Sequence, residues 1–392
     1  MTVVMSSSHR GLVMDVMSYS LGAGGPTAVQ PYGRDAAVVT SFSLLDETRR
    51  QLGHALDLAG LGPVEAWSQV VAKWPGAQLR AYHPRTAAPG PALLIMPAPI
   101  KRAYIWDLLP RVSVVRHCLR LRLRVFLLEW LDPGPSEDAF GLADYADRLP
   151  LAALDVISEE TGSAAALLAG HSLGGTLAAI FASLRPERVR GLVLIEAPLA
   201  FGASEAGPLA RGIDAMPHAR ELRALAGSPV PGSFLGFLAI SALPQTFLLQ
   251  RWSDLAASLA DPLATAVHVR VERWTLDELA MPGALFEDVF EQLYREDRFR
   301  AGTLEVSEDR LTGATRLQCP VLAVVNTSGQ VVPPTSLVAV LGAIPELRLR
   351  TLYYEGGRGS ALDHVGPLVA PLAHEVHWPQ IVEWVGQCWS ES

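Results

Sequence analysis

The chain alternates short apolar runs with longer stretches in which apolar residues recur at helical spacing. Between residues 91 and 198, four apolar runs are short enough for strands and contain few polar residues. Strands buried on both faces of a parallel sheet have this composition. Helical stretches separate the runs at steps of about 30 residues, the usual length of a strand, helix and strand unit. We therefore predict a doubly wound, mostly parallel sheet whose first strands lie at 92–96, 125–128, 164–169 and 189–195.

This alternation stops after the fourth strand. The next stretch has the pattern of helices, at 209–225, 234–259 and 282–300, and we predict that it forms a helical cap inserted into the sheet. An insertion at the carboxyl ends of parallel strands would cover the place where such sheets bind ligands. Strand patterns return at 320–325 and 347–354, and a closing helix follows at 379–389.

These patterns divide the chain into five segments. Residues 91–198 and 317–392 are predicted to form the two parts of the core, with the cap at 199–316 between them. We expect residues 35–90 to form an N-terminal helical segment, because the apolar positions at 35–74 lie among charges without strand-like alternation and predict two or three short helices, with an edge strand after them at 78–82. Residues 1–34 contain many serines and glycines and predict a poorly ordered lead-in.

Composition and charge exclude several classes of partner. A net charge of −8 argues against nucleic acid and anionic membrane surfaces. No apolar run approaches the roughly 18 residues of a membrane span. Hydrophobic residues make up 49% of the 392, an excess that favours an apolar pocket or an oligomer interface, such as that of a homodimer. The three cysteines lack metal-ligand spacing and the start of the chain lacks a signal-peptide pattern, so we expect a cytoplasmic protein.

One candidate nucleophile stands out in the sequence. Gly170-His171-Ser172-Leu173-Gly174 follows a predicted strand, and apolar residues then recur at spacings of four, three and four, which is one face of a helix. A Gly-x-Ser-x-Gly pattern between a strand and a helix is typical of a nucleophile elbow, in which a tight turn presents the serine. The small residues on either side let neighbouring backbone pass close by. We therefore predict that Ser172 is a catalytic nucleophile.

A serine hydroxyl needs a base, and the base needs an acid to hold its tautomer. His364 is the best-placed histidine, because it follows the last predicted strand by ten residues and precedes the closing helix. Glu196 ends an otherwise apolar strand, where a carboxylate is costly to bury unless it is paired, and we predict that it is the acid. Asp363 and Glu355 remain alternatives.

Backbone N–H groups are the expected donors for a tetrahedral oxyanion. The N–H of Leu173 lies at the start of the predicted helix, where the helix dipole favours negative charge. A second donor is expected in the loop after the strand at 92–96, from Ile100 or from Lys101, with Ile100 our first choice.

An ordered series of motifs resembles the catalytic domain of polyhydroxyalkanoate synthases, over roughly residues 90 to 390. These motifs are 97–108 (PAPIKRAYIWDL), 128–130 (LEW), the elbow with 175–177 (GTL), 188–190 (RVR), 282–296 (PGALFEDVFEQLYRE), 331–334 (VVPP) and 363–366 (DHVG). The resemblance implies an α/β-hydrolase fold and acyl transfer chemistry. It also has two departures, since those synthases carry cysteine at the position of Ser172 and aspartate at the position of Gly329. The strand end 194–197 is similar to the place where some haloalkane dehalogenases carry their acid, which supports Glu196.

Together these features predict a serine hydrolase that cleaves esters or thioesters of aliphatic acids, including 3-hydroxy acids, through an acyl-serine intermediate. A first alternative is an acyltransferase that, like the synthases it resembles, uses hydroxyacyl-CoA. A second alternative is a scaffold or partner subunit whose catalysis is impaired. The expected ligand is a small-molecule or polymeric acyl ester or thioester, and no metal or bound cofactor is expected, with acyl-CoA entering as a substrate.

Overall fold

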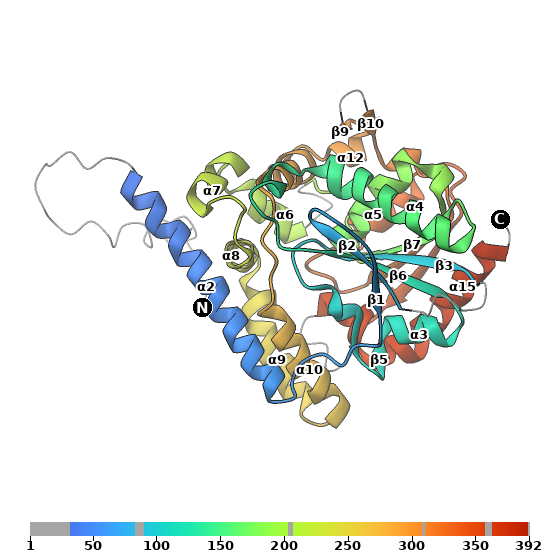
Figure 1. Cartoon of the computed structure of the whole chain (residues 1–392), viewed down its shortest axis with the longest axis horizontal. Helices are drawn as coiled ribbons and strands as arrows, with labels where there is room; N and C mark the ends of the chain where they lie inside the picture. Colours follow the sequence, from blue (N-terminus) through green and yellow to red (C-terminus); the bar gives the residue numbers. More distant parts are fainter. Residues whose placement is uncertain (1–31, 83–89, 203–206, 308–309, 357–362, 391–392) are drawn as a thin grey trace, which may run out of the picture.

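A computed structural model describes residues 32–82, 90–202, 207–307, 310–356 and 363–390. Its core is an eight-stranded sheet in the order β1-β2-β6-β3-β7-β8-β11-β12 (Figure 1). The six strands from β6 to β12 in this order run parallel, and β2 and β1 continue the sheet antiparallel at one edge. The strands are β1 (Gln69–Trp74), β2 (Ala77–Ala81), β3 (Ala92–Met96), β6 (Arg124–Trp130), β7 (Ala166–His171), β8 (Val189–Ile195), β11 (Val321–Asn326) and β12 (Leu349–Tyr354).

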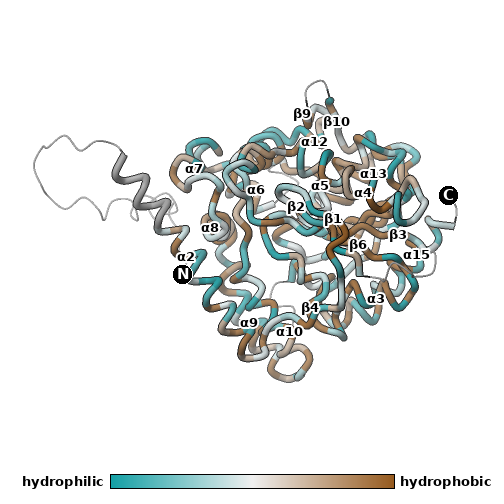
Figure 2. Tube along the Cα trace, in the orientation of Figure 1, coloured by the Kyte–Doolittle hydropathy of each residue, from teal (hydrophilic) through white to brown (hydrophobic). Residues whose placement is uncertain are grey.

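Helices cover both faces of the sheet. Successive residues of each central strand point to opposite sides, and the apolar residues on both sides have to be buried. In β3, Leu94 and Met96 pack into one apolar cluster with the helices α4 (Leu149–Thr161) and α5 (Leu173–Leu184). Leu93 and Ile95 pack into a second cluster on the other side, with α3 (Val114–Arg120) and α15 (Trp378–Ser390). The most hydrophobic parts of the trace accordingly run through the middle of the molecule (Figure 2).

Most of the cap elements are helices, and they lie between β8 and β11 in the chain. They include α6 (Gly207–Asp214), α7 (Ala219–Ala226), α8 (Gly232–Ala242), α9 (Gln250–Ser258), α10 (Pro262–Thr275), α11 (Gly283–Asp288) and α12 (Arg298–Ala301). A two-stranded hairpin of β9 (Leu304–Ser307) and β10 (Arg310–Thr312) follows. Two predicted helices are wrong as continuous elements, because the stretch 209–225 forms α6 and α7, and 234–259 is bent by 111° between α8 and the segment after it.

The segment before β3 differs from the sequence prediction. Instead of the short helices predicted at 35–74, the chain forms one helix, α2 (Tyr32–Leu58), and the strand β1. The strand predicted at 78–82 corresponds to β2, which pairs with β1 and joins the sheet. The predicted lead-in at 1–34 falls outside the described residues except where α2 begins. Smaller elements complete the core, namely β4 (Asp107–Leu109), β5 (Val112–Ser113), α13 (Thr335–Gly342) and α14 (Gly366–Val369).

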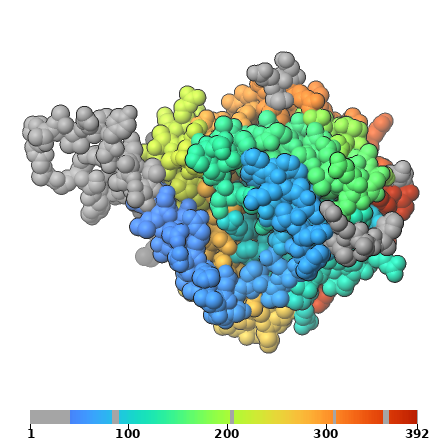
Figure 3. All heavy atoms as spheres, in the orientation of Figure 1, coloured from blue at the N-terminus to red at the C-terminus, as the bar shows by residue number. Residues whose placement is uncertain are grey.

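The helix α2 lies along the outside of the cap, beside α7, α8 and α10 (Figures 1 and 3). Asp46 of α2 is buried and accepts the first backbone N–H groups of α8, from Gly232 at 3.1 Å and Ser233 at 2.7 Å. The hydroxyl of Ser233 donates in return to the carbonyl of Phe42 at 2.9 Å. A capping carboxylate from another helix satisfies donors that α8 cannot pair internally, so α2 is part of the cap's structure.

Within the described ranges, none of the helices combines the length and the apolar composition needed to cross a membrane on its own. One bent pair, Gly232–Ala242 with Gln245–Ser258, reaches that length and composition when its two arms are counted together.

Candidate active site

Ser172 occupies a strained turn between β7 and α5. Its backbone has φ 54° and ψ −134°, a conformation that residues other than glycine rarely adopt. The neighbouring glycines make room for this turn. A Cβ on Gly174 would lie 2.3 Å from the carbonyl oxygen of Met96, and one on Gly170 would lie 2.5 Å from the Cα of Gly175. The turn therefore presses against the backbone of β3 and its following loop, as the elbow pattern predicts.

His364 and Glu196 are brought together from elements that are 168 residues apart in the chain. The Nδ1 of His364 lies 2.7 Å from the Oε2 of Glu196, whose side chain is 1% exposed. Glu196 follows β8 directly, and its positive φ of 43° ends the strand. In this position the carboxylate accepts from Nδ1–H, and the Nε2 of the neutral ring keeps its lone pair.

Burial shifts the pKa of both side chains. It lowers the pKa of His364 to about 4, against a small opposing effect of the Asp363 charge, so the imidazole is neutral near pH 7. Burial also raises the pKa of Glu196 well above its ordinary value, and the charge of Asp363 adds to this rise. A buried carboxylate is costly without a partner, and the hydrogen bond from His364 supplies one.

The two alternative acids lie elsewhere. Asp363 accepts a hydrogen bond from the side-chain amide of Asn326 at 2.8 Å, at the carboxyl end of β11. Glu355 is exposed to solvent. Of the three carboxylates named from the sequence, Glu196 is therefore the one that contacts the ring of His364.

His171, the residue before the serine, is a contact that the sequence analysis missed. Its Nε2 lies 2.8 Å from the carbonyl oxygen of His364, and the two rings are 4.5 Å apart between centroids. A carbonyl only accepts, so Nε2 carries a proton and donates it. Burial lowers the pKa of His171 well below its ordinary value, which keeps this ring neutral. His171 thereby ties the elbow to the loop that holds His364.

The expected oxyanion donors lie on the two segments that meet at the elbow. Leu173 is the first residue of α5, a position whose N–H has no partner within the helix. In the facing loop Pro99 carries no N–H, so the N–H groups of Ile100 and Lys101 remain candidates and that of Ala98 joins them. The ring N–H of Trp130 donates to the carbonyl of Pro97 at 2.7 Å and holds the start of this loop. The structure thus adds Ala98 to the candidates, since its backbone nitrogen approaches the elbow so closely that a Cβ on Gly174 would lie 2.7 Å from it.

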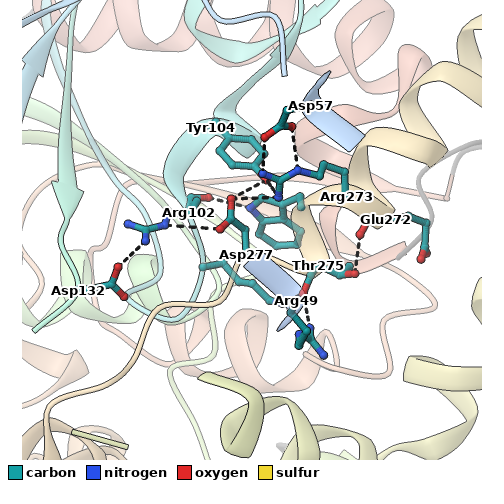
Figure 4. A network of polar contacts seen from close by, with 11 residues as sticks. Arg49, Asp57, Arg102, Tyr104, Asp132, Glu272, Arg273, Thr275 and Asp277 are labelled. Carbon is teal, nitrogen blue, oxygen red and sulfur yellow. Dashed lines mark hydrogen bonds and ion pairs between the residues drawn. The ribbon is translucent and has the colours of Figure 1, made fainter. Parts of the chain in front are cut away.

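A segment of the cap fixes the far side of the same loop. The N–H of Leu279 donates to the carbonyl of Ile100 at 3.2 Å, and the N–H of Arg102 donates to the carbonyl of Asp277 at 3.3 Å. Side chains extend this connection to α2, since Arg273 forms ion pairs with both Asp57 and Asp277 (Figure 4). The loop that carries Ile100 is therefore held by the core, by the cap and by the N-terminal helix.

A cavity of about 280 Å³ joins these groups. Ser172, Leu173, His364 and Ile100 all line it, together with His171. Its cap side is mostly apolar, with residues that include Leu209, Ile213, Leu235, Leu238, Phe247, Met281, Val289, Phe290 and Tyr294. Within the described part of the chain, no group of three or more histidine, cysteine, aspartate or glutamate side chains has the arrangement of a metal site.

Comparison with known proteins now places the chain in a family. Residues 93–364 match the family described as "alpha/beta hydrolase fold", a span that runs from β3 to His364. The chain belongs to the α/β-hydrolase fold family. Like other members, this α/β-hydrolase carries its candidate nucleophile at a strand-to-helix turn and its candidate base after the last strand.

Its curated relatives are polymerases. This α/β-hydrolase is 27% identical over 297 residues to the poly(3-hydroxyalkanoate) polymerase subunit PhaC of Haloferax mediterranei, over 75% of the present chain and 58% of the relative. It is 26% identical over 305 residues to the PhaC of Synechocystis, over 75% and 77% of the two chains. The chain thus spans less than two thirds of the length of the Haloferax protein, while the resemblance to polyhydroxyalkanoate synthases is confirmed.

Among solved structures, the fold of this α/β-hydrolase is similar to that of a thermophilic esterase from Thermogutta terrifontis. The TM-score is 0.46 at 18% identity, and the match covers 83% of the present chain and 99% of the esterase.

Proposed function

We propose that this enzyme transfers an acyl group through Ser172, taking it from the thioester or ester of an aliphatic hydroxy acid. The observation that carries the proposal is the buried hydrogen bond between His364 and Glu196 beside a cavity that also exposes Ser172. The polymerase relatives favour transfer to a hydroxyl acceptor, with hydroxyacyl-CoA as the donor. This corresponds to the first alternative from the sequence, and it takes precedence here over hydrolysis.

In the proposed reaction, Ser172 attacks the acyl carbonyl carbon while the Nε2 of His364 takes its proton. The negative charge that develops on the carbonyl oxygen is stabilised by the backbone N–H groups of Leu173 and Ile100. The carbon–sulfur or carbon–oxygen bond then breaks, and His364 returns the proton to the leaving thiol or alcohol. A hydroxyl acceptor repeats these steps on the acyl-serine and releases Ser172. Glu196 holds the Nδ1–H tautomer throughout, and the chain's own residues suffice for each of these proton transfers.

Hydrolysis is the second candidate, and Ser172 itself favours it. The related synthases are expected to carry a thiolate, whose thioester passes the acyl group on readily, whereas an acyl-serine ester is a common intermediate before attack by water. The apolar cap over the cavity favours transfer, because it limits the access of water to the intermediate.

Incubation with 3-hydroxybutyryl-CoA separates the two candidates. Release of CoA with formation of an oligomer or of a transfer product supports acyl transfer, and release of the free acid supports hydrolysis. Ser172→Ala is expected to abolish both while leaving the fold intact, and activity retained in this variant contradicts the serine mechanism. Labelling of Ser172 by a fluorophosphonate probe tests the remaining alternative, since a scaffold whose catalysis is impaired would not react. Ser172→Cys is the matched variant, and we expect it to shift the products toward transfer.

A further inference from the structure

The cavity beside Ser172 is apolar over most of its wall but has one charged corner. Four cationic side chains line the cavity, from Arg49, Lys101, Arg102 and Arg251, and Glu278 is the carboxylate among its described lining residues. Arg102 pairs with Asp132 outside this corner. The other three come from α2, from the loop after β3 and from α9, so three separate segments of the chain converge here.

The three cations are only partly satisfied by the protein. The ammonium of Lys101 donates to Glu278 Oε1 at 2.8 Å and to the carbonyl of Thr275 at 2.7 Å, which uses two of its three N–H groups. The Nη2 of Arg49 donates to the same carbonyl at 2.6 Å and lies 3.2 Å from Glu278 Oε2, while its Nε is buried without a partner among the described residues. Glu278 therefore serves two cations at once.

Arg251 has a carboxylate of its own, Glu272, to which its Nε donates at 2.9 Å. Its Nη2 also contacts Glu272 and reaches the hydroxyl of Thr275 at 3.4 Å. These contacts leave the Nη1 groups of both arginines without a partner in the described part of the chain. Each guanidinium therefore has N–H donors to offer to a ligand in the cavity.

The surroundings of Lys101 indicate where a bound anion would be stabilised. Burial lowers the pKa of Lys101; Glu278 opposes this, and the positive charges of Arg49 and Arg251 add to the lowering. Arg49, Lys101 and Arg251 carry three positive charges against the two carboxylates that pair with them, Glu278 and Glu272, so a further anion at this corner would be stabilised.

We propose that Arg49, Lys101 and Arg251 form a subsite for an anionic oxygen group, a carboxylate or a phosphate, on the acyl donor that reacts with Ser172. The inference rests on the proposed function, because it takes the cavity to be the place where the donor binds. It also gives α2 a part in recognition, since Arg49 reaches the cavity from that helix. An arginine fork suits both groups, since it matches the geometry of a carboxylate or a phosphate.

Two pairs of substrates distinguish the sources of the anion. The first pair is p-nitrophenyl hexanoate and the mono-p-nitrophenyl ester of adipic acid, which have the same chain length and differ by a terminal carboxylate. The second pair is the pantetheine and the 4′-phosphopantetheine thioesters of 3-hydroxybutyrate, which differ by one phosphate. For each pair, the ratio of kcat/KM for the anionic over the neutral substrate is measured in the wild type, Arg49→Gln and Arg251→Gln. Arg220→Gln, an exposed arginine of α7 outside the cavity, is the matched control.

We expect both variants to lower the ratio about tenfold or more for one of the two pairs, the effect of losing a charge-assisted hydrogen bond. A fall for the first pair identifies a carboxylate, and a fall for the second identifies phosphate. Ratios that stay within about twofold of wild type for both pairs overturn the subsite. Two arginines are varied so that a folding defect in one does not decide the outcome.

A binding measurement separates this subsite from the proposed reaction. Calorimetric titration of the Ser172→Ala protein with monomethyl adipate and with dimethyl adipate compares an anion with its neutral ester without any turnover. Tighter binding of the monoester that is lost when Arg251→Gln is added supports a carboxylate site even if the acyl chemistry proves different. The subsite is overturned, even if Ser172 is the nucleophile, when the two esters bind equally and the Ser172→Ala protein binds CoA equally with and without the added Arg251→Gln substitution.

Discussion

Replacing Glu196 with glutamine tests the central contact of the site with little change in volume. The carboxylate is 1% exposed, and its Oε2 lies 2.7 Å from the Nδ1 of His364. In the variant, the amide can turn its NH2 group toward Nδ1, which then has to accept and places the ring proton on Nε2. A ring in that tautomer cannot take the proton of Ser172. Loss of a triad acid by this route lowers kcat by about 10⁴, which corresponds to about 5.5 kcal/mol in the barrier.

The assay is kcat for p-nitrophenyl butyrate at pH 7.5, with thermal unfolding of each variant as a check on the fold. Asp363→Asn and Glu355→Gln are the controls, because each removes a nearby carboxylate that does not contact the ring of His364. We expect each to keep kcat within about tenfold of wild type, well short of the loss of a triad acid. The assignment of the acid is refuted if Glu196→Gln lowers kcat by less than about tenfold, or if Asp363→Asn lowers kcat more than Glu196→Gln does.

Two further predictions concern the elbow and a buried histidine. Gly174→Ala should lower kcat by about 10²-fold or more, because its Cβ would lie 2.3 Å from the carbonyl oxygen of Met96 and would displace the turn. The control is Gly386→Ala, in α15 with open space around it, which should keep full activity and raise the free energy of unfolding by about 0.5–1 kcal/mol. Equal activity of the two variants would contradict the packing argument. Burial lowers the pKa of His374 to about 4. Since the unfolded chain then binds the proton more tightly, stability should fall as the pH drops from 6.5 toward 4, by on the order of 2 kcal/mol at pH 5 from this group. Urea unfolding at pH 7 and pH 5 measures the loss, which should shrink in His374→Gln; an unchanged loss would rule this histidine out as its source.

The parallel core could be predicted because its strands are buried on both faces. The predicted strands at 92–96 and 189–195 have the bounds of β3 and β8 in the structure. The hairpin strand β1 was missed, since its six residues are half-buried or exposed and include a lysine and a glutamine. The break after α8 was missed because apolar residues continue across it, although Pro244 lies in the bend and is the signal that could have found it.

Within the site, Ser172, His364 and Glu196 could be named because each occupies the end of a recognisable strand or the loop after one. His171 could not, since its partner is a backbone carbonyl that any residue would supply. Arg49 could not either, because its contacts with Thr275 and Glu278 cross more than 220 residues of chain and depend on how α2 lies against the cap. Contacts of this kind follow from tertiary packing, and local patterns contain no trace of them.

The placement of α2 also has a consequence for the order of events during synthesis. Asp57 and Arg273 are 216 residues apart in the chain, and Arg49 and Thr275 are 226 apart. At about 5–20 residues per second, a ribosome needs on the order of ten to forty seconds to make the partners of this helix after the helix itself has been made. Until the end of that interval, the cap elements available to α2 are the earlier helices α7 and α8, the second of which Asp46 caps. The corner of the cavity that contains Arg49 can therefore form only after the hairpin, the first parallel strands and most of the cap have been made, and it can do so before β11, β12 and His364 are made.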